Sequence, residues 1–368
     1  MVEKIGMLHC ENTLNYGSMM LGENVITHLS RLSNKDLNFI ILSYKKEETQ
    51  KRFIAATGLN TIKVRKFKNK GQNIFIKIIT YFCDFFKGVF FPKKLDIFKK
   101  TEDCDIILIV GGDDLSEYYS IFGLLIQLRD IYALSKFKKV YLLGQTIGPF
   151  NSWRIPLVKF ILGKIKIIYT RDQKSFYYLK NILKIKTKCK LSKDLAILDL
   201  AKQKESFDIS KYNLKPSKYI SFVPSGLWNQ YSIDYNSYIN GLSCLIKDLI
   251  KIAEKKGYKV LIFPHVYYKK DLKVVEDIIK KINSPSLILI KEKLLPYQAR
   301  SILGSGYLTV TTRMHAAISS LQRGIPAIAL SYSIKYKGVI GDGLDLPNLI
   351  IEVNKNNCKK DFMKVIHL

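Results

Sequence analysis

Residues 307–323 have the sequence YLTVTTRMHAAISSLQR, in which an apolar strand predicted at Tyr307–Thr311 runs directly into a helix predicted at Met314–Arg323. Short runs rich in Ile, Val and Leu that alternate with stretches of helical period are typical of parallel sheets covered by helices. The same alternation recurs through most of the chain. It predicts an α/β protein whose functional loops follow the strands, at the carboxyl edge of each sheet.

The alternation predicts two successive sets of strands and helices. In the first half, strands are expected at Lys4–His9, Phe39–Ser43, Ile62–Arg65, Asp105–Val110, Lys139–Leu143 and Ile165–Thr170, and helices at Met19–Arg31, Ser120–Leu134 and Ile155–Leu162. In the second half, further strands are expected at Tyr219–Pro224, Lys259–Pro264 and Leu287–Ile290, and helices at Tyr238–Lys256, Lys270–Ile282 and Tyr297–Ser301. A chain of 368 residues exceeds what one hydrophobic core comfortably holds. We therefore predict two doubly wound, Rossmann-like lobes facing a cleft, the glycosyltransferase-B-like arrangement.

The boundary between the lobes is predicted from a polar segment. Residues 202–218 are rich in charged residues and include Pro216, as interdomain linkers often do. We expect an N-terminal Rossmann-like lobe at 1–203 and a C-terminal one at 204–345. The remaining tail, 346–368, is expected to pack back on the first lobe.

The charge balance indicates an anionic partner or surrounding. The chain has 60 Lys and Arg against 31 Asp and Glu, a formal net charge of +29. Nucleic acid, an anionic membrane surface and a phosphorylated substrate would each fit, and so would a general compositional bias. The chain has no helix-turn-helix, zinc-finger spacing or RNA-binding signature, and its lysines are scattered, so no nucleic-acid partner is expected.

Cysteine spacing and hydropathy indicate the compartment. The six cysteines lie far apart, with no CxxC and no Cys/His cluster, which fits a reducing cytoplasm and gives neither a disulfide framework nor a zinc site. No stretch of about 18 uncharged apolar residues occurs, so export and membrane spanning are not expected. The segment Phe75–Phe91 holds six phenylalanines among lysines. It fits an amphipathic helix on an anionic bilayer, and it equally fits a helix packed on the lobe.

The most informative candidate site follows the strand Tyr307–Thr311. Arg313 and His315 are expected at the N-terminus of the next helix, where free backbone N–H groups and the helix dipole attract anions. Arginine binds phosphate or carboxylate bidentately, and histidine titrates near neutrality. The pair therefore predicts an anion site with a proton donor in it, against the alternative of a surface arginine and a capping histidine.

A second candidate follows the strand Ile165–Thr170. Asp172 is well placed to cap the next helix, which would leave Arg171 projecting from the end of the strand. A salt-bridged cap is the alternative interpretation. The arginine would gain a functional meaning if the two lobes brought it opposite Arg313.

Glycine-containing loops supply further candidates. Asn15 and Gly17 precede the first helix, Gly112 and Asp113 follow a buried strand, and Gln145 follows another. Glycine at a strand end allows a ligand to approach the backbone, although tight packing is the default explanation. None of the loops matches a P-loop or a dinucleotide fingerprint.

Three further observations concern acids, histidines and nucleophiles. His265 is expected to face the cleft, as a substrate contact or as a satisfied buried histidine. Asp113 and Asp114 are adjacent and could form a metal site or an acid/base pair, but no third carboxylate or histidine follows at ligand spacing, so neither is expected. No cofactor is expected either. No nucleophile motif occurs, which leaves group transfer as the natural reaction.

Taken together, these segments resemble the polysaccharide pyruvyl transferase family over nearly the whole chain. The segments that carry the resemblance are NYGSMMLGENV from residue 15, DIILIVGGDDL from 105, GQTIGPF from 144, YTRDQKSFYYL from 169, KDLAIL from 193, FPHV from 263 and TTRMHAAISSLQRGIPAIALSYSIKYKGV from 311. The last is the most specific. Two positions depart from the family pattern: Asp113 replaces a common third glycine, and Ser18 replaces an acidic residue.

The resemblance implies a function and a set of residues. The donor would be phosphoenolpyruvate, and the acceptor a sugar of a bacterial surface polysaccharide, such as a capsule or exopolysaccharide, or its lipid-linked precursor. Members of the family hold the donor with the arginine of the RD motif and with the Arg and His of the R-x-H motif, which match Arg171, Arg313 and His315. Lys335 is a further candidate for the donor phosphate.

The sequence also bears on where the protein is expected to act and on which other functions would fit it. The implied donor, phosphoenolpyruvate, is made in the cytoplasm, so the enzyme is expected there. A lipid-linked acceptor would explain peripheral contact of a basic face or of the Phe-rich segment with the inner face of the plasma membrane. One alternative is a glycosyltransferase-B-type enzyme that uses a nucleotide sugar. A non-catalytic membrane-associated binding protein would explain the charge and the Phe-rich segment, but it would leave the R-x-H helix without a role.

Overall fold

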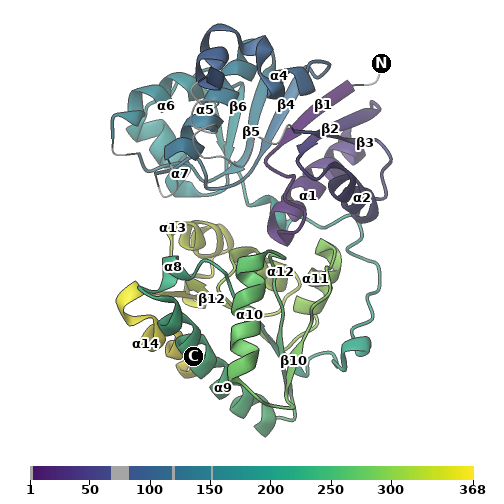
Figure 1. The fold of residues 1–368 in the computed structure, drawn as a ribbon, viewed down its shortest axis with the longest axis vertical. Coiled ribbons are helices and arrows are strands. Elements are labelled where there is room, and N and C mark those ends of the chain that lie inside the picture. Colours follow the sequence, from purple (N-terminus) through teal and green to yellow (C-terminus); the bar gives the residue numbers. More distant parts are fainter. Residues whose placement is uncertain (1–2, 68–82, 118–120, 151) are drawn as a thin grey trace. The chain divides into compact units, whose positions relative to one another are not determined.

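Two parallel sheets organise the protein. The computed structural model describes residues 3–67, 83–117, 121–150 and 152–368. The described residues within 1–13 and 18–195 form one compact unit, and those within 14–17 and 196–368 form a second (Figure 1). The lobe boundary predicted from the polar segment, 203/204, lies within the second of these units, whose main segment begins at Ala196. Among the described residues, no helix combines the length and the apolar character needed to cross a membrane.

The first unit contains a seven-stranded sheet in which every neighbouring pair of strands is parallel, with the order β3-β2-β1-β4-β5-β6-β7. The strands are β1 Glu3–Leu8, β2 Leu37–Ser43, β3 Ile62–Lys66, β4 Ile106–Val110, β5 Lys139–Gln145, β6 Ile167–Thr170 and β7 Lys188–Leu191. The order reverses beside β1, which is the doubly wound topology expected from the alternating pattern. Six of these strands lie where the sequence predicted them, and β7 is additional.

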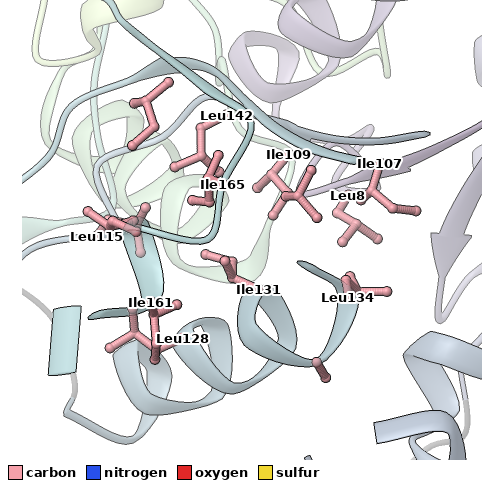
Figure 2. Packing of buried hydrophobic residues seen from close by; sticks show 14 of the residues in the cluster. Leu8, Ile107, Ile109, Leu115, Leu128, Ile131, Leu134, Leu142, Ile161 and Ile165 are labelled. Atoms are coloured by element: carbon pink, nitrogen blue, oxygen red, sulfur yellow. The ribbon is translucent and has the colours of Figure 1, made fainter. Parts of the chain in front are cut away.

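Helices cover this sheet. They include α1 Tyr16–Leu32, α2 Lys46–Thr57, α4 Asp96–Lys100, α5 Ile121–Ser135, α6 Arg154–Leu162 and α7 Gln173–Tyr177. Figure 2 shows how Leu128 and Ile131 of α5 and Ile161 of α6 face Ile109 of β4 and Leu142 of β5. These side chains are almost fully buried, so the sheet and its helices share one apolar core. Of the Phe75–Phe91 segment, residues 75–82 lie outside the described residues, and 83–90 are helical.

The second unit contains a six-stranded parallel sheet with the order β10-β9-β8-β11-β12-β13. The strands are β8 Tyr219–Val223, β9 Lys259–Ile262, β10 Leu287–Leu289, β11 Leu308–Thr311, β12 Ala327–Ser331 and β13 Ile350–Glu352. The helices are α8 Trp228–Tyr231, α9 Tyr235–Lys255, α10 Lys269–Lys281, α11 Pro296–Leu303, α12 Met314–Leu321, α13 Ile334–Tyr336 and α14 Cys358–Met363. Again the order reverses in mid-sheet, beside β8.

The C-terminal tail belongs to the second unit, whereas the sequence analysis expected it to pack on the first lobe. Strand β13 extends the second sheet by pairing with β12. Phe362 of α14 is fully buried in the second core, where its ring lies against Tyr238 of α9. The physical reason is burial of apolar surface. Phe362, Cys358 and Val365 are all buried in the second core, and this burial stabilises the tail on the second unit.

Candidate functional site

The N-terminus of α12 is built by a sharp change of backbone direction after β11. Arg313 is the N-cap residue, with extended dihedral angles, and His315 is the second residue of the helix. Thr311 holds the turn: its hydroxyl donates to the carbonyl of Val223 at 2.9 Å and accepts from the backbone N–H of Arg313 at 2.8 Å. The structure therefore places Arg313 and His315 beside the first-turn N–H groups of one helix, the arrangement that attracts anions.

Arg313 is held by an acidic residue that the sequence analysis did not single out. Its Nε donates to Oδ1 of Asp271 at 3.1 Å, and its Nη2 donates to the same oxygen. Asp271 lies in the first turn of α10 and is buried. A Cβ at Gly226 would come within 2.7 Å of the Asp271 backbone nitrogen and carboxylate, so only glycine allows this approach.

The ion pair fixes the charge of Arg313. Burial opposes the charged guanidinium, but the carboxylate of Asp271 outweighs that effect, so the pKa of Arg313 is raised. The side chain of Arg313 keeps 17% of its surface exposed, whereas that of Asp271 keeps 5%. The arginine is thus a permanently charged group that is anchored on one side and accessible on another.

A cluster of buried tyrosines supports the same turn. The carbonyl of Thr312 accepts from the hydroxyls of Tyr231 at 2.7 Å and Tyr336 at 2.9 Å. Burial raises the pKa of Tyr336 to about 12 and raises the pKa of Tyr231 as well, so both phenols remain donors at neutral pH. Lys335 donates from Nζ to the hydroxyl of Tyr332 at 2.7 Å, at the edge of this cluster.

Residues 14–17 belong to the second unit and carry the NYGS loop to His315. The backbone N–H of Tyr16 donates to the carbonyl of His265 at 3.1 Å, and Asn15 forms an antiparallel bridge with Val266. A Cβ at Gly17 would lie only 2.3 Å from Nδ1 of His315. The glycine at position 17 is therefore required by close packing against the imidazole.

His265 lies on the other side of this loop. It is 1% exposed, and the Tyr16 ring meets its imidazole edge-on at 5.4 Å between centroids. Burial, followed by the positive charges of His315, Arg313 and Arg300, lowers the pKa of His265 well below its ordinary value. Within the part of the chain that the structure describes, Nε2 of His265 is buried without a hydrogen-bond partner. A buried imidazole nitrogen without a hydrogen-bond partner is compatible with a contact to a bound ligand and equally with a structural role.

Arg171, in the first unit, does not project from the end of β6 as the sequence analysis expected. It is 2% exposed; its Nη1 donates to Asp194 at 2.8 Å and its Nε to the hydroxyl of Thr146 at 2.9 Å. Burial opposes its charge, but the nearby carboxylates, first that of Asp194, outweigh the burial and raise the pKa of Arg171. Arg171 is drawn inward because Asp194, which lies further along the chain, supplies a buried carboxylate for its guanidinium.

Asp172 caps α7, as predicted. Its Oδ1 accepts from the backbone N–H of Ser175 at 2.8 Å. Its Oδ2 accepts from the hydroxyls of Ser175 and Thr146, both at 2.9 Å. Because Thr146 also accepts from Arg171, one buried network joins the GQTIGPF loop to the start of α7.

The remaining loop candidates of the first unit pack against one another. The carbonyl of Gly112 accepts from the backbone N–H of Thr146 at 2.9 Å, and Nε2 of Gln145 donates to the carbonyl of Ile109 at 3.3 Å. The carbonyl of Asp113 accepts from the hydroxyl of Ser116. In the described ranges, no three His, Cys, Asp or Glu side chains gather in a way that could hold a metal ion.

The fold of the chain is shared with UDP-N-acetylglucosamine 2-epimerases. A putative enzyme of this kind from Listeria monocytogenes matches with a TM-score of 0.65 at 11% identity, over 99% of this chain and 86% of that chain. The enzyme from Neisseria meningitidis, bound to UDP-GlcNAc, matches with a TM-score of 0.63 at 12% identity, over 100% of this chain and 90% of that chain. At such identities the likeness establishes the fold alone, which is the glycosyltransferase-B-like class predicted from the sequence.

The family follows from the sequence match. The model of the polysaccharide pyruvyl transferase family matches residues 15–334. This chain therefore belongs to the polysaccharide pyruvyl transferase family, which confirms the resemblance drawn from its motifs. It is also 24% identical over 289 residues to the amylovoran biosynthesis protein AmsJ of Erwinia amylovora, a match that spans 73% of this chain and 66% of that protein. The chain thus covers slightly less than two thirds of that relative's length.

Proposed function

We propose that the protein transfers the enolpyruvyl unit of phosphoenolpyruvate to a sugar of a bacterial surface polysaccharide, or to its lipid-linked precursor. The product is a pyruvyl ketal, and phosphate is released. The single observation that carries the proposal is the R-x-H turn of α12, where an anchored arginine and a histidine share one helix N-terminus. Membership of the pyruvyl transferase family supports the same reaction class.

The second unit offers the charge that this donor needs. Phosphoenolpyruvate carries a phosphate and a carboxylate, and the accessible side of Arg313 would bind one of them bidentately. The first N–H groups of α12 would bind the other. Asp271 prevents the arginine from turning away, so the binding geometry exists before the donor arrives. Lys335, on the α13 turn, is proposed to approach the phosphate from the tyrosine cluster.

His315 is proposed as the general acid. Its proton passes to the methylene carbon of the enol, which leaves positive charge at the central carbon for a sugar hydroxyl to attack. That hydroxyl loses its proton to His315, the carbon–oxygen bond to phosphate breaks, and the neighbouring hydroxyl adds to close the ketal as its proton leaves to the released phosphate. A general acid of this kind contributes about 10²–10⁴ in rate.

The first unit is proposed to serve the acceptor and to add positive charge. Arg171 would act from its buried position, where Asp194 and Thr146 fix it, by holding the GQTIGPF loop in shape. Gln145, Gly112 and Asp113 lie on the adjoining loops and are proposed to contact the acceptor sugar. The donor is made in the cytoplasm, which would place the reaction there, and a lipid-linked acceptor would bring it to the inner face of the membrane.

The experiment that tests this proposal measures phosphate release and formation of the pyruvyl ketal. Purified protein is incubated with phosphoenolpyruvate and candidate saccharide acceptors, phosphate release is followed, and the ketal is identified by mass spectrometry. We expect His315→Ala to lower kcat by about 10²–10⁴ while the protein stays folded. His367→Ala, an exposed histidine of the same unit, is the matched control and should leave kcat unchanged. A His315→Ala variant with full activity would remove the histidine from the mechanism.

A further inference from the structure

Exposed aromatic side chains gather on the first unit. Among the described residues, every phenylalanine that is largely exposed belongs to this unit: Phe85, Phe86, Phe90, Phe91, Phe122, Phe137 and Phe160. Phe90 keeps 67% of its surface in water and Phe122 keeps 60%. Single exposed apolar residues are ordinary, but a group of this size on one unit marks an interaction surface.

Six of these rings come from neighbouring elements. Phe85 and Phe160, from the helical residues 83–90 and from α6, line one hollow of about 130 Å³ with Tyr132 of α5. The rings of Tyr132 and Phe160 lie 5.8 Å apart, and those of Phe86 and Phe90 stack at 6.4 Å. Helices α5 and α6 lie next to each other over the first sheet (Figure 1), so these rings form one continuous area.

Lysines surround the same area. Their ammonium groups lie over the rings: Lys93 over Phe137 at 4.9 Å, Lys94 over Phe91 at 4.8 Å, Lys136 over Tyr132 at 4.5 Å and Lys164 over Phe160 at 5.0 Å. Lysine stems lie along apolar surface in this way, with the charged heads beside it. The ammonium group of Lys136 also donates to the carbonyl of Val89 at 2.8 Å.

The acids nearby do not cancel this charge. Asp84 pairs with Lys87 at 3.6 Å, and Asp130 pairs with Arg129 at 2.6 Å. The four lysines that lie over the rings have no such ion pair among the described residues. We define the aromatic–lysine face as Phe85, Phe86, Phe90, Phe91, Phe137 and Phe160 with Lys93, Lys94, Lys136 and Lys164.

We propose that the aromatic–lysine face binds the surface of an anionic lipid bilayer. Aromatic rings enter the boundary between headgroups and acyl chains, while lysines at the same depth pair with anionic headgroups. A protein partner with an acidic rim would match the charge as well, but it would not offer the exposed rings a hydrocarbon phase to enter. The net charge of +29 also favours a partner surface that is anionic throughout. The inference stands on the face alone and goes beyond the proposed reaction.

The test is co-sedimentation with lipid vesicles. Wild-type protein is mixed with phosphatidylcholine vesicles and with vesicles of phosphatidylcholine and phosphatidylglycerol. We expect binding to the anionic vesicles that weakens with salt, and far weaker binding to the neutral ones. Phe86→Ser/Phe90→Ser should weaken binding at least about tenfold. Lys93→Gln/Lys94→Gln should weaken it about 30-fold, because each lysine near an anionic surface is worth about a factor of five.

Matched controls lie on the second unit. Ile233→Ser/Tyr307→Ser removes exposed apolar side chains, and Lys359→Gln/Lys360→Gln removes two exposed charges; both should bind vesicles as the wild type does. Circular dichroism checks that every variant is folded, and titration with phosphoenolpyruvate tests donor binding separately. If the donor binds to no form while the face variants still lose vesicle binding, the proposed reaction fails and the membrane inference stands.

Two results would overturn the inference. One is equal binding of wild type and face variants to anionic vesicles. The other is a dimer in size-exclusion chromatography that Phe86→Ser/Phe90→Ser dissociates, with no vesicle binding by the wild type; that result would assign the face to a second copy of the chain.

Discussion

Replacing Gly17 with alanine tests the contact between the NYGS loop and His315. The added Cβ would lie 2.3 Å from Nδ1, 2.7 Å from Cγ and 2.8 Å from Cβ of His315. Ordinary contacts begin at 3.4 Å, so the nearest pair must separate by 3.4 − 2.3, or about 1 Å. Rotation of the ring cannot relieve the contact with Cβ, because that atom is fixed to the backbone of α12.

The expected effect follows from that displacement. A catalytic group moved by about 1 Å loses on the order of 10² in rate, so kcat should fall about 100-fold in Gly17→Ala. Overpacking of this kind costs about 1–3 kcal/mol of unfolding free energy. The thermal midpoint should therefore fall by several degrees, while the protein remains folded at 25 °C.

The assay follows phosphate release from phosphoenolpyruvate beside a thermal melt. Gly123→Ala in α5 is the matched control, because nothing lies within 4 Å of its added Cβ and helix propensity predicts a gain of about 0.5–1 kcal/mol. A Gly17→Ala protein with the kcat and thermal midpoint of the wild type would refute the packing of Gly17 against His315 and its catalytic meaning.

Three further predictions concern the buried charges of the two units. Asp271→Asn removes the carboxylate that anchors Arg313; it should lower unfolding free energy by about 2–3 kcal/mol in a denaturant melt and raise the apparent KM for phosphoenolpyruvate. Asp194→Asn leaves the fully buried Arg171 without its counter-ion and should cost about 3–5 kcal/mol in the same melt. Burial lowers the pKa of His265 in the folded state below its unfolded value of about 6.5. The contribution of the neutral imidazole to the free energy of unfolding is therefore fully present above pH 6.5, and below that pH it falls by up to about 1.4 kcal/mol per pH unit. His265→Gln should reduce this slope in denaturant melts at several pH values.

The controls separate these effects from general loss of charge. Asp248→Asn removes a half-buried carboxylate that pairs with the exposed Lys251 on α9, and it should cost less than about 1 kcal/mol. If Asp271→Asn or Asp194→Asn cost no more than this control, the buried pairs do not hold their arginines as described. An unchanged acid slope in His265→Gln would show that the histidine is not buried in the neutral form.

The doubly wound fold could be predicted because most strands are short apolar runs that alternate with stretches of helical period. Strand β4, IILIV, is an example: every residue is apolar, as a strand covered on both faces requires. Strand β7, KCKL, was missed because its alternating lysines hide the pattern, and α2 was missed because only Thr49, Phe53 and Ala56 of its residues are buried.

The R-x-H turn could be predicted because a strand, its turn and the following helix are adjacent in the sequence. The partners of that turn could not, since tertiary structure alone brings them together. In the sequence, Asp271 looks like any acidic residue in the first turn of a helix, here α10. Asp194 lies in the polar segment after β7, where nothing marks it as the partner of an arginine. For the same reason, nothing in the sequence indicated that Gly17 packs on a histidine near the other end of the chain.

The most direct test of the account is isothermal titration of the purified protein with phosphoenolpyruvate, beside a panel of UDP-sugars. Wild type, Arg313→Ala and the control Arg323→Ala, an exposed arginine of the same unit, are compared. We expect phosphoenolpyruvate to bind to the wild type and to Arg323→Ala, and we expect this binding to be lost in Arg313→Ala. Binding of a nucleotide sugar alone, with no phosphoenolpyruvate bound to the wild type, would contradict it and would assign the protein to the nucleotide-sugar glycosyltransferases.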